Sequence, residues 1–469
     1  MMLAWALGVL TMSVGLQFSL PRFAKKMDQA RYPTGLACAL ILGYLALRQA
    51  SEPDPLVIPD FASNLFRITA HTQSWLGLVA FVFLAGLLSL GFGSKSSEER
   101  EIRSWTLTRV CLGAFLLTTA NNLVVVALGW FLCTQPWSTA ITASLPSSRQ
   151  KESFQGTAVG EWIVLAILFF ALAILFLSYG SVNLMELGDR IRSEANAPDF
   201  WLYVSLALIV CAFATHLALL PFQVLSATRV RESENGLQAF SSFFVFIATC
   251  GLAWNILGRA LSLPLQHWDR FLFALALLSL FGGALWFLVV RRTNELLLAS
   301  LSHMGGWVLL LLCCSETVDA EGLCVRLLWA YSLGFLPVLF GMIALEKNGG
   351  RNGGVLAAGW FWNHPVLGFA VLTAIATLAF VPFFPSHFAR LDILSLTAEI
   401  GPAATLIACG SSAILAYGWF RHACPWAATP AEIPWEYRAK WESAFFAVVA
   451  ASLWIGGGWL LARQLNLLG

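Results

Sequence analysis

Two stretches of the chain, Thr215-His-Leu-Ala-Leu-Leu-Pro-Phe222 and Pro382-Phe-Phe-Pro-Ser-His-Phe-Ala-Arg-Leu-Asp-Ile-Leu394, combine ionisable residues with proline inside long apolar segments. Proline interrupts a helix and frees backbone carbonyls, which at membrane depth must find other partners. An ionisable side chain at that depth is costly and usually has a function. The two stretches therefore indicate interrupted membrane helices that line a transport path.

The composition indicates a polytopic membrane protein. Of its 469 residues, 58% are hydrophobic and 12% are charged, which excludes a soluble enzyme. The formal net charge of +2 gives no indication of nucleic acid, and most of the ten cysteines lie in apolar runs without metal-ligand spacing. No phosphate loop, nucleophile elbow or haem spacing is present in the sequence. We therefore expect no cofactor or metal, and at most a non-catalytic translocation role within a proton-pumping quinone oxidoreductase.

Apolar segments long enough to cross a bilayer recur along the whole chain. A window of about 20 residues gives fourteen candidate spans, so the expected fold is all-α. The first apolar stretch lacks a basic leader region, and we expect it to be a span rather than a signal peptide. The candidate spans are 1–20, 33–49, 72–92, 104–120, 122–144, 160–181, 200–222, 237–257, 270–290, 295–314, 322–345, 365–385, 390–419 and 442–462.

The distribution of lysine and arginine predicts the orientation. Loops after odd-numbered spans hold 19 of these residues and the opposite side holds 9. Positive loops stay in the cytoplasm, so both termini are expected outside a cell (inner) membrane. The two proline-bearing segments lie in the seventh and twelfth spans, and an odd offset of five reverses their direction, as in inverted repeats. The predicted divisions are 1–103 (helices 1–3), 104–257 and 258–419 (two five-helix repeats), and 420–469 (loop and helix 14).

Several segments resemble the antiporter-like membrane subunits of respiratory complex I. The break around Pro221 resembles that family's broken seventh helix, and the break after Pro382 resembles its broken twelfth. The superfamily also contains Mrp-type cation/proton antiporter subunits and the membrane subunit of a two-part inorganic-carbon uptake system. The resemblance implies fourteen helices, two inverted five-helix repeats with broken helices 7 and 12, and a chain of ionisable groups at mid-membrane. The matching segments are 121–130, 154–161, 179–186, 216–222, 300–305 and 382–394.

The resemblance also implies candidate residues, with departures from the family pattern. Phe131 stands where complex I subunits have a glutamate, and His216 stands where they have its lysine partner. Arg390 replaces a second lysine, although a guanidinium does not release its proton in proteins. Proton or ion path residues are predicted at His216, Glu161, His303, Arg390 and His387, and helix breaks at Pro221, Pro382 and Pro385.

Each path residue also has an interpretation without transport. His216 is then a neutral core histidine bonded to a freed carbonyl, and His303 a polar contact between packed helices. His387 and Arg390 then extend to the membrane interface. Glu161 is then a solvated carboxylate at a helix N-terminus.

Three functions fit these observations. The first is a proton- or cation-translocating subunit of a complex I-like (NADH-quinone oxidoreductase) or Mrp-like assembly. The second is the membrane subunit of an inorganic-carbon (CO2/bicarbonate) uptake complex that uses proton flux and a soluble partner. The third is a structural paralogue that does not conduct. In each case the expected partners are other membrane subunits and the lipid bilayer, and no binding of nucleic acid is expected.

Overall fold

The computed structural model describes residues 64–67, 69–93, 97–144, 148–193, 200–223, 237–262, 268–290, 293–314, 320–347, 365–381 and 384–428. Within these ranges the chain is helical, and the only β-structure is two isolated bridges. The expected spans at 1–20, 33–49 and 442–462, and Pro382, lie outside them. The chain forms two compact units, one of residues 1–217 with 241–270 and one of residues 218–240 with 271–469.

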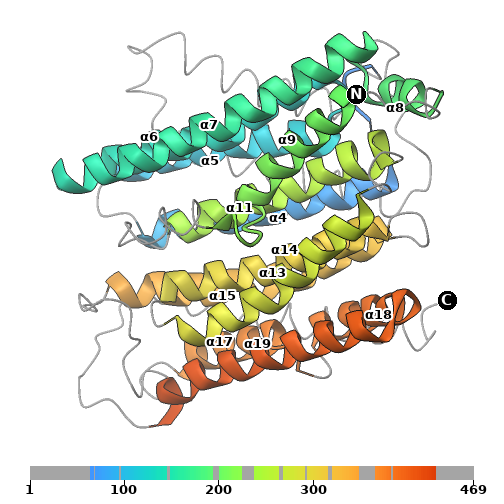
Figure 1. Ribbon diagram of the computed structural model, residues 1–469. Helices are drawn as coiled ribbons and strands as arrows, with labels where there is room; N and C mark the ends of the chain where they lie inside the picture. The colour runs from blue at the N-terminus through green and yellow to red at the C-terminus, as the bar shows by residue number, and fades with distance from the viewer. Residues whose placement is uncertain are drawn as a thin grey trace. The chain divides into compact units, whose positions relative to one another are not determined.

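Close helix packing organises the first unit, in which α4 packs on α5, α5 on α6, α6 on α7 and α7 on α9 (Figure 1). Gly113 permits the contact between α5 and α6, because a Cβ there would lie 2.5 Å from the backbone nitrogen of Cys133. The helices are α4 (Ala70–Gly93), α5 (Ser97–Thr119), α6 (Leu123–Ser144), α7 (Ser148–Tyr179), α8 (Leu184–Ser193), α9 (Phe200–His216), α11 (Leu237–Ala253) and the π-helix η1 (Trp254–Ala260).

The turn at Asn121 and Asn122 connects α5 to α6 at one end of this unit. It is hydrogen-bonded to the segment around Leu65 and to the connection between α7 and α8. Asn121 donates its N–H to Leu65 O at 2.9 Å and accepts from Leu184 N at 2.9 Å. Asn122 caps α6, because its Oδ1 accepts the N–H of Val124 at 2.9 Å. The buried polar turn is therefore stabilised by hydrogen bonds from each connection that meets it.

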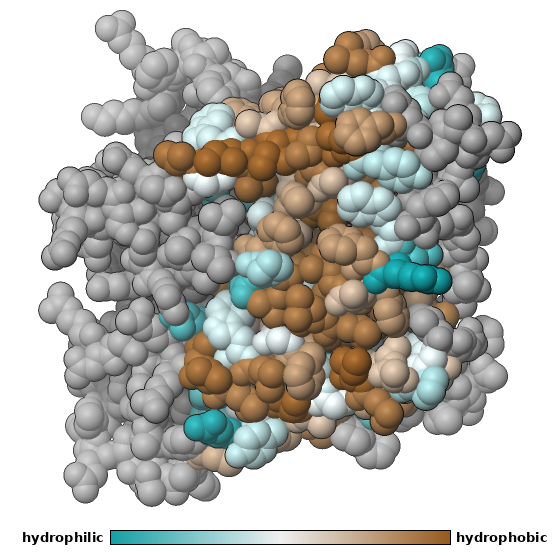
Figure 2. All heavy atoms as spheres, in the orientation of Figure 1, coloured by the Kyte–Doolittle hydropathy of each residue, from teal (hydrophilic) through white to brown (hydrophobic). Residues whose placement is uncertain are grey.

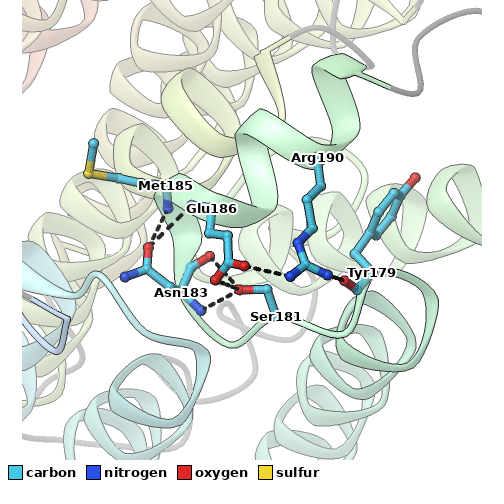
Figure 3. A network of polar contacts seen from close by, with 6 residues as sticks. All are labelled: Tyr179, Ser181, Asn183, Met185, Glu186 and Arg190. Atoms are coloured by element: carbon cyan, nitrogen blue, oxygen red, sulfur yellow. Dashed lines mark hydrogen bonds and ion pairs between the residues drawn. The ribbon is translucent and has the colours of Figure 1, made fainter.

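A second polar network fixes the elbow between α7 and the short amphipathic helix α8 (Figure 3). Asn183 Oδ1 caps α8 by accepting from Met185 N at 2.9 Å, and Arg190 donates to Tyr179 O at the end of α7 at 2.5 Å. Glu186 accepts from Ser181 Oγ at 2.8 Å and from Arg190. The Ser181 hydrogen bond, followed by Arg190, lowers the pKa of Glu186 below its usual value. Hydropathy did not predict α8, because this ten-residue helix is short and carries several charged side chains.

The second unit contains α13 (Asp269–Val289), α14 (Thr293–Cys313), α15 (Ala320–Lys347), α17 (Pro365–Leu378), α18 (Pro385–Ile400) and α19 (Pro402–Ala428). Helix α15 packs on α14, α17 and α18, and α19 packs on α17 and α18. Several of these helices are apolar along their whole length, so they are stable only in a core or in a bilayer.

The expected boundaries at 365–385 and 390–419 are wrong. Helix α17 already ends at Leu378, and α18 begins at Pro385, in the first turn where proline is tolerated. A separate helix, α19, follows after Gly401. The expected span 390–419 merged most of α18 with α19, because a hydropathy window averages over Gly401 and Pro402, where one helix ends and the next begins. Similarly, α9 ends at His216 rather than at residue 222.

Six helices of the described residues are long and apolar enough to cross a membrane. Apolar side chains also predominate on the face of the described residues drawn in Figure 2. Outward apolar side chains are stable only in contact with lipid or another apolar surface, so the protein is a multi-pass membrane protein. The six segments are Val159–Tyr179, Ser242–Ala260, Asp269–Val289, Glu295–Cys313, Ala320–Leu339 and Pro402–Cys424.

Candidate functional site: buried ionisable residues at two helix breaks

The first helix break follows His216, the last residue of α9. Ala218 has a left-handed backbone with φ 52°, so the helix does not continue past His216. In the second unit, Leu220 donates its N–H to Ser279 Oγ of α13 at 3.1 Å. A side chain therefore satisfies a backbone group of the broken segment, as membrane depth requires.

His216 lies inside the first unit with 7% of its surface exposed. Its ring packs edge-on against Trp130 of α6, with ring centroids 4.9 Å apart. Phe131, at the position where the family pattern has a glutamate, instead packs against Trp162 of α7. The imidazole therefore has an aromatic neighbour on α6 in place of a carboxylate there.

Glu161 is buried, with 6% of its surface exposed. Helix α7 begins at Ser148, more than three turns before it, so the alternative of a solvated carboxylate at a helix N-terminus is wrong. Hydropathy placed the helix start too late because polar residues occupy the first turns of α7. Helix α7 packs on α9, which carries His216, so Glu161 is a buried acid on a neighbouring helix.

In the second unit, His303 of α14 is completely buried. Two glycines bring α13 and α14 together, because a Cβ at Gly283 would lie 2.7 Å from His303 N and one at Gly306 would lie 2.7 Å from Leu280 N. This close approach places His303 Nδ1 2.9 Å from Leu280 O. The carbonyl only accepts, so Nδ1 carries the hydrogen.

The other ring nitrogen of His303 accepts hydrogen bonds from two donors. Trp307, one turn later on α14, donates from Nε1 at 3.1 Å, and Arg390 of α18 lies 3.3 Å away through Nη2. Trp307 and Arg390 can only donate, so Nε2 of His303 is the acceptor and the ring is neutral in this arrangement. His303 could take up a proton at Nε2 only if both donors moved away.

Arg390 is 3% exposed, so the expectation that it extends to the membrane interface is wrong. Its guanidinium lies 4.9 Å from the centre of the Trp307 ring and also over the ring of Phe380. Phe380 belongs to the break itself and has a left-handed φ of 58°. The charge is thus placed between two aromatic faces, which attract cations.

The start of α18 is fixed to the end of α17. Ser386 Oγ donates to Thr377 O, and His387, with its side chain half-buried, interacts with the backbone of Phe380. Asp392 lies 3.6 Å from Arg326 of α15, and both side chains are about one-third exposed. The acidic residue closest in sequence to Arg390 thus pairs with another arginine.

The predicted path residues fall into both units, with His216 and Glu161 in the first and the others in the second. His303 and Arg390, from α14 and α18, are hydrogen-bonded to each other. Trp307 and Phe380 were missed. The spacing of four residues from His303 to Trp307 could have identified the tryptophan, whereas no sequence signal identified Phe380.

This architecture defines a class of protein: polytopic helical membrane proteins with buried basic residues at proline-bearing helix breaks. The family model "NADH:quinone oxidoreductase/Mrp antiporter, TM" matches residues 120–416. The chain belongs to this family.

Curated relatives of similar length are distant in sequence. NADH-quinone oxidoreductase subunit N 2 of Acidobacterium capsulatum is 24% identical over 408 residues, which cover 81% of this chain and 78% of that protein. The subunit N of Alkalilimnicola ehrlichii is 22% identical and covers 72% of this chain and 68% of its own.

Solved structures share the fold. A chain of respiratory complex I from Thermus thermophilus has a TM-score of 0.73 at 18% identity, covering 96% of both chains. A chain of an archaeal membrane-bound sulfane sulfur reductase has a TM-score of 0.79 at 14% identity, covering 98% of this chain and 93% of its own. A chain of the Mrp complex from Dietzia sp. DQ12-45-1b has a TM-score of 0.77 at 14% identity, covering 99% and 94%.

Proposed function

We propose that this chain is a proton-translocating membrane subunit of a multi-subunit complex of the NADH-quinone oxidoreductase or Mrp type. The observation that carries the proposal is the burial of basic side chains at two helix breaks, with His216 at the end of α9 and Arg390 with His303 beside the α17–α18 break. Such groups are retained in membrane segments chiefly where charge moves. The subunit N relatives and the Mrp complex of similar fold support this class of function.

The proposed topology has about fourteen transmembrane helices with two inverted five-helix repeats. Residues 104–257 and 258–419 would form the repeats, 1–103 the first three helices, and 420–469 a loop and the last helix. The N-terminus would lie outside the cell (inner) membrane, in accord with the bias of basic loops. The partners would be the other membrane subunits of the complex.

In the proposed mechanism, His216 is the group that takes up and releases a proton. Histidine changes charge near neutral pH, and a nearby carboxylate favours its charged form. Phe131 removes the carboxylate that the family has on α6, so the buried Glu161 on α7 is the proposed partner. Arg390 holds its proton permanently, so it would act through the electrostatic field of its positive charge on nearby groups. His303 and His387 are the titratable groups beside it.

Proton uptake into proteoliposomes containing the assembled complex tests this assignment. We expect His216→Ala to lower the rate at least about tenfold, since a positioned proton acceptor is usually worth this much or more. His422→Ala is the matched control, because His422 is a histidine of α19 that contacts Phe287 and is not on the proposed path. Equal uptake by His216→Ala and wild type, at equal assembly of the complex, would contradict the role of His216.

Phe131 favours a second candidate, the membrane subunit of an inorganic-carbon uptake complex, because it departs from the complex I pattern. Growth of a host that lacks carbonic anhydrase tests this function when the chain is expressed with the soluble protein encoded beside it. Rescue at ambient CO2 would support the second candidate. No rescue, with both proteins present in the membrane fraction, would eliminate it. A third candidate, a non-conducting subunit, predicts that the His216 and Glu161 variants leave proton uptake unchanged.

A further inference from the structure

Arg390 is a permanently charged group in the interior of the second unit, with 3% of its surface exposed. Its Nη2 reaches the neutral ring of His303 at 3.3 Å. Its Nε and Nη1 are buried and have no hydrogen-bond partner among the described residues. Buried polar groups are almost always paired, and a buried charge requires an opposite charge or equivalent stabilisation.

The described neighbours do not supply that opposite charge. Among the described residues, the titratable groups that interact electrostatically with the guanidinium are His303, His387 and Cys409, and none of these is a carboxylate. Asp392, two residues further along α18, pairs with Arg326 and is directed to a site about one-third exposed. Trp307 and Phe380 attract the cation through their ring faces but accept no hydrogen bond from Nε or Nη1 as an oxygen or a halide would.

The guanidinium lies near the start of α18, and this location adds a second contribution that favours an anion. Arg390 lies in the second turn of the sixteen-residue helix α18, and its charge lies over Phe380, just before that helix begins. The residue before α18, Phe384, provides no side-chain cap. The N-terminus of a helix carries partial positive charge and favours anions. The helix end and the guanidinium therefore attract the same kind of ligand.

We propose that Arg390 binds a small monovalent anion of the halide class at the break between α17 and α18. One negative charge balances the single positive charge of the guanidinium, whereas a divalent anion would leave an excess of buried negative charge. Bound there, the anion accepts hydrogen bonds from the N–H groups at Nε and Nη1, whereas Nη2 is directed to His303. It also lowers the positive potential at His303. This inference does not depend on the proposed function, because an anion can serve a conducting or a non-conducting subunit.

X-ray diffraction from the assembled complex, crystallised with sodium bromide in place of sodium chloride, tests the site directly. We expect an anomalous bromine peak within hydrogen-bonding distance of Nε or Nη1 of Arg390. A water molecule at this position would overturn the proposal, and so would a carboxylate from the part of the chain outside the described residues.

Thermal unfolding provides an independent measurement. The unfolding midpoint of the complex is compared in sodium chloride and sodium gluconate at equal ionic strength, for wild type, Arg390→Gln and Arg192→Gln. We expect chloride to raise the midpoint saturably in wild type and in Arg192→Gln, whose guanidinium is exposed on α8, but not in Arg390→Gln. Equal midpoints of wild type in the two salts would overturn the proposal.

If Arg390→Gln does not assemble, the bromide experiment on wild type decides. Its outcome is also separate from that of the proton-uptake experiment. A bromine peak at Arg390 together with unchanged uptake by His216→Ala would support the anion site and contradict the proposed function.

Discussion

Ala218 and Phe380 adopt left-handed backbone conformations at the ends of α9 and α17, although neither is glycine. At the end of α17, Phe380 donates its N–H to Thr377 O and Val381 donates to Ala376 O, the pattern of a Schellman cap. Glycine is usual at this position because it has no Cβ to clash. Phenylalanine contributes a ring that lies against Arg390, which gives a physical reason for a strained residue there.

Substitution of Ala218 tests the backbone strain at the first break. We expect Ala218→Val to lower the free energy of unfolding by about 2 kcal/mol, because a β-branched residue fits the left-handed region poorly. Ala218→Gly should stay within about 1 kcal/mol of wild type, since glycine tolerates this conformation. Thermal unfolding of the purified complex compares the two variants. A midpoint for the valine variant equal to that of the glycine variant would show that no strain exists.

Helices α13 and α14 owe their close approach to glycine. Gly283 lies against His303 and Gly306 against Leu280, and the short separation aligns His303 with the Leu280 carbonyl. Small residues at helix contacts are a common means of association in membranes, where apolar packing against lipid gives little preference. The orientation of the buried histidine is therefore a consequence of how two helices pack.

Alanine substitutions at two glycines separate helix packing from helix propensity. We expect Gly283→Ala to destabilise by about 1–3 kcal/mol, because its Cβ would meet backbone atoms that cannot move alone. Gly410→Ala of α19 is the control, since a Cβ there meets nothing within 4 Å, and alanine has the higher helix propensity. Unfolding midpoints compare the variants. A loss at Gly410 as large as that at Gly283 would contradict the packing explanation.

At the scale of the molecule, the membrane-spanning helices among the described residues differ in how much they are buried. The share of the spanning segment that is buried is 44% for α7 and α13 and 33% for α19, but 94% for α14 and 89% for α11 with η1. A segment that exposes much apolar surface must contact lipid or another subunit, whereas a buried one contacts this chain. Polar groups such as His303 are thus found on a helix shielded from lipid.

Labelling with a lipid-soluble carbene reagent tests this division. In the chain reconstituted without its partner subunits, we expect the label on outward residues of α7, α13 and α19, such as Leu177, Val289 and Leu406. Helix α14 should remain almost unlabelled. Mass spectrometry of the peptides measures the distribution, and comparable label on α14 and α19 would contradict the described packing. Protection of α19 in the assembled complex would mark it as a contact with another subunit.

The membrane class, the all-helical structure and the two interrupted helices follow from the sequence alone, because hydropathy and proline act locally along the chain. The sequence also identified His303 and Arg390 as unusual, since ionisable residues are rare in apolar segments. Hydropathy did not predict the start of α7, and hence the burial of Glu161, because polar residues occupy the first turns of that helix. It also did not predict the division between α18 and α19 at Gly401.

Tertiary packing is needed to show that Trp307 and Arg390 both donate to His303 and that Phe380 supports the guanidinium. It is also needed to show that the described residues leave two guanidinium nitrogens, Nε and Nη1, without a hydrogen-bond partner. These relations join α13, α14, α17 and α18, which are far apart in sequence. Their mutual approach depends on packing at glycines and on capping at the breaks, and local hydropathy contains no information about which side chains will face one another.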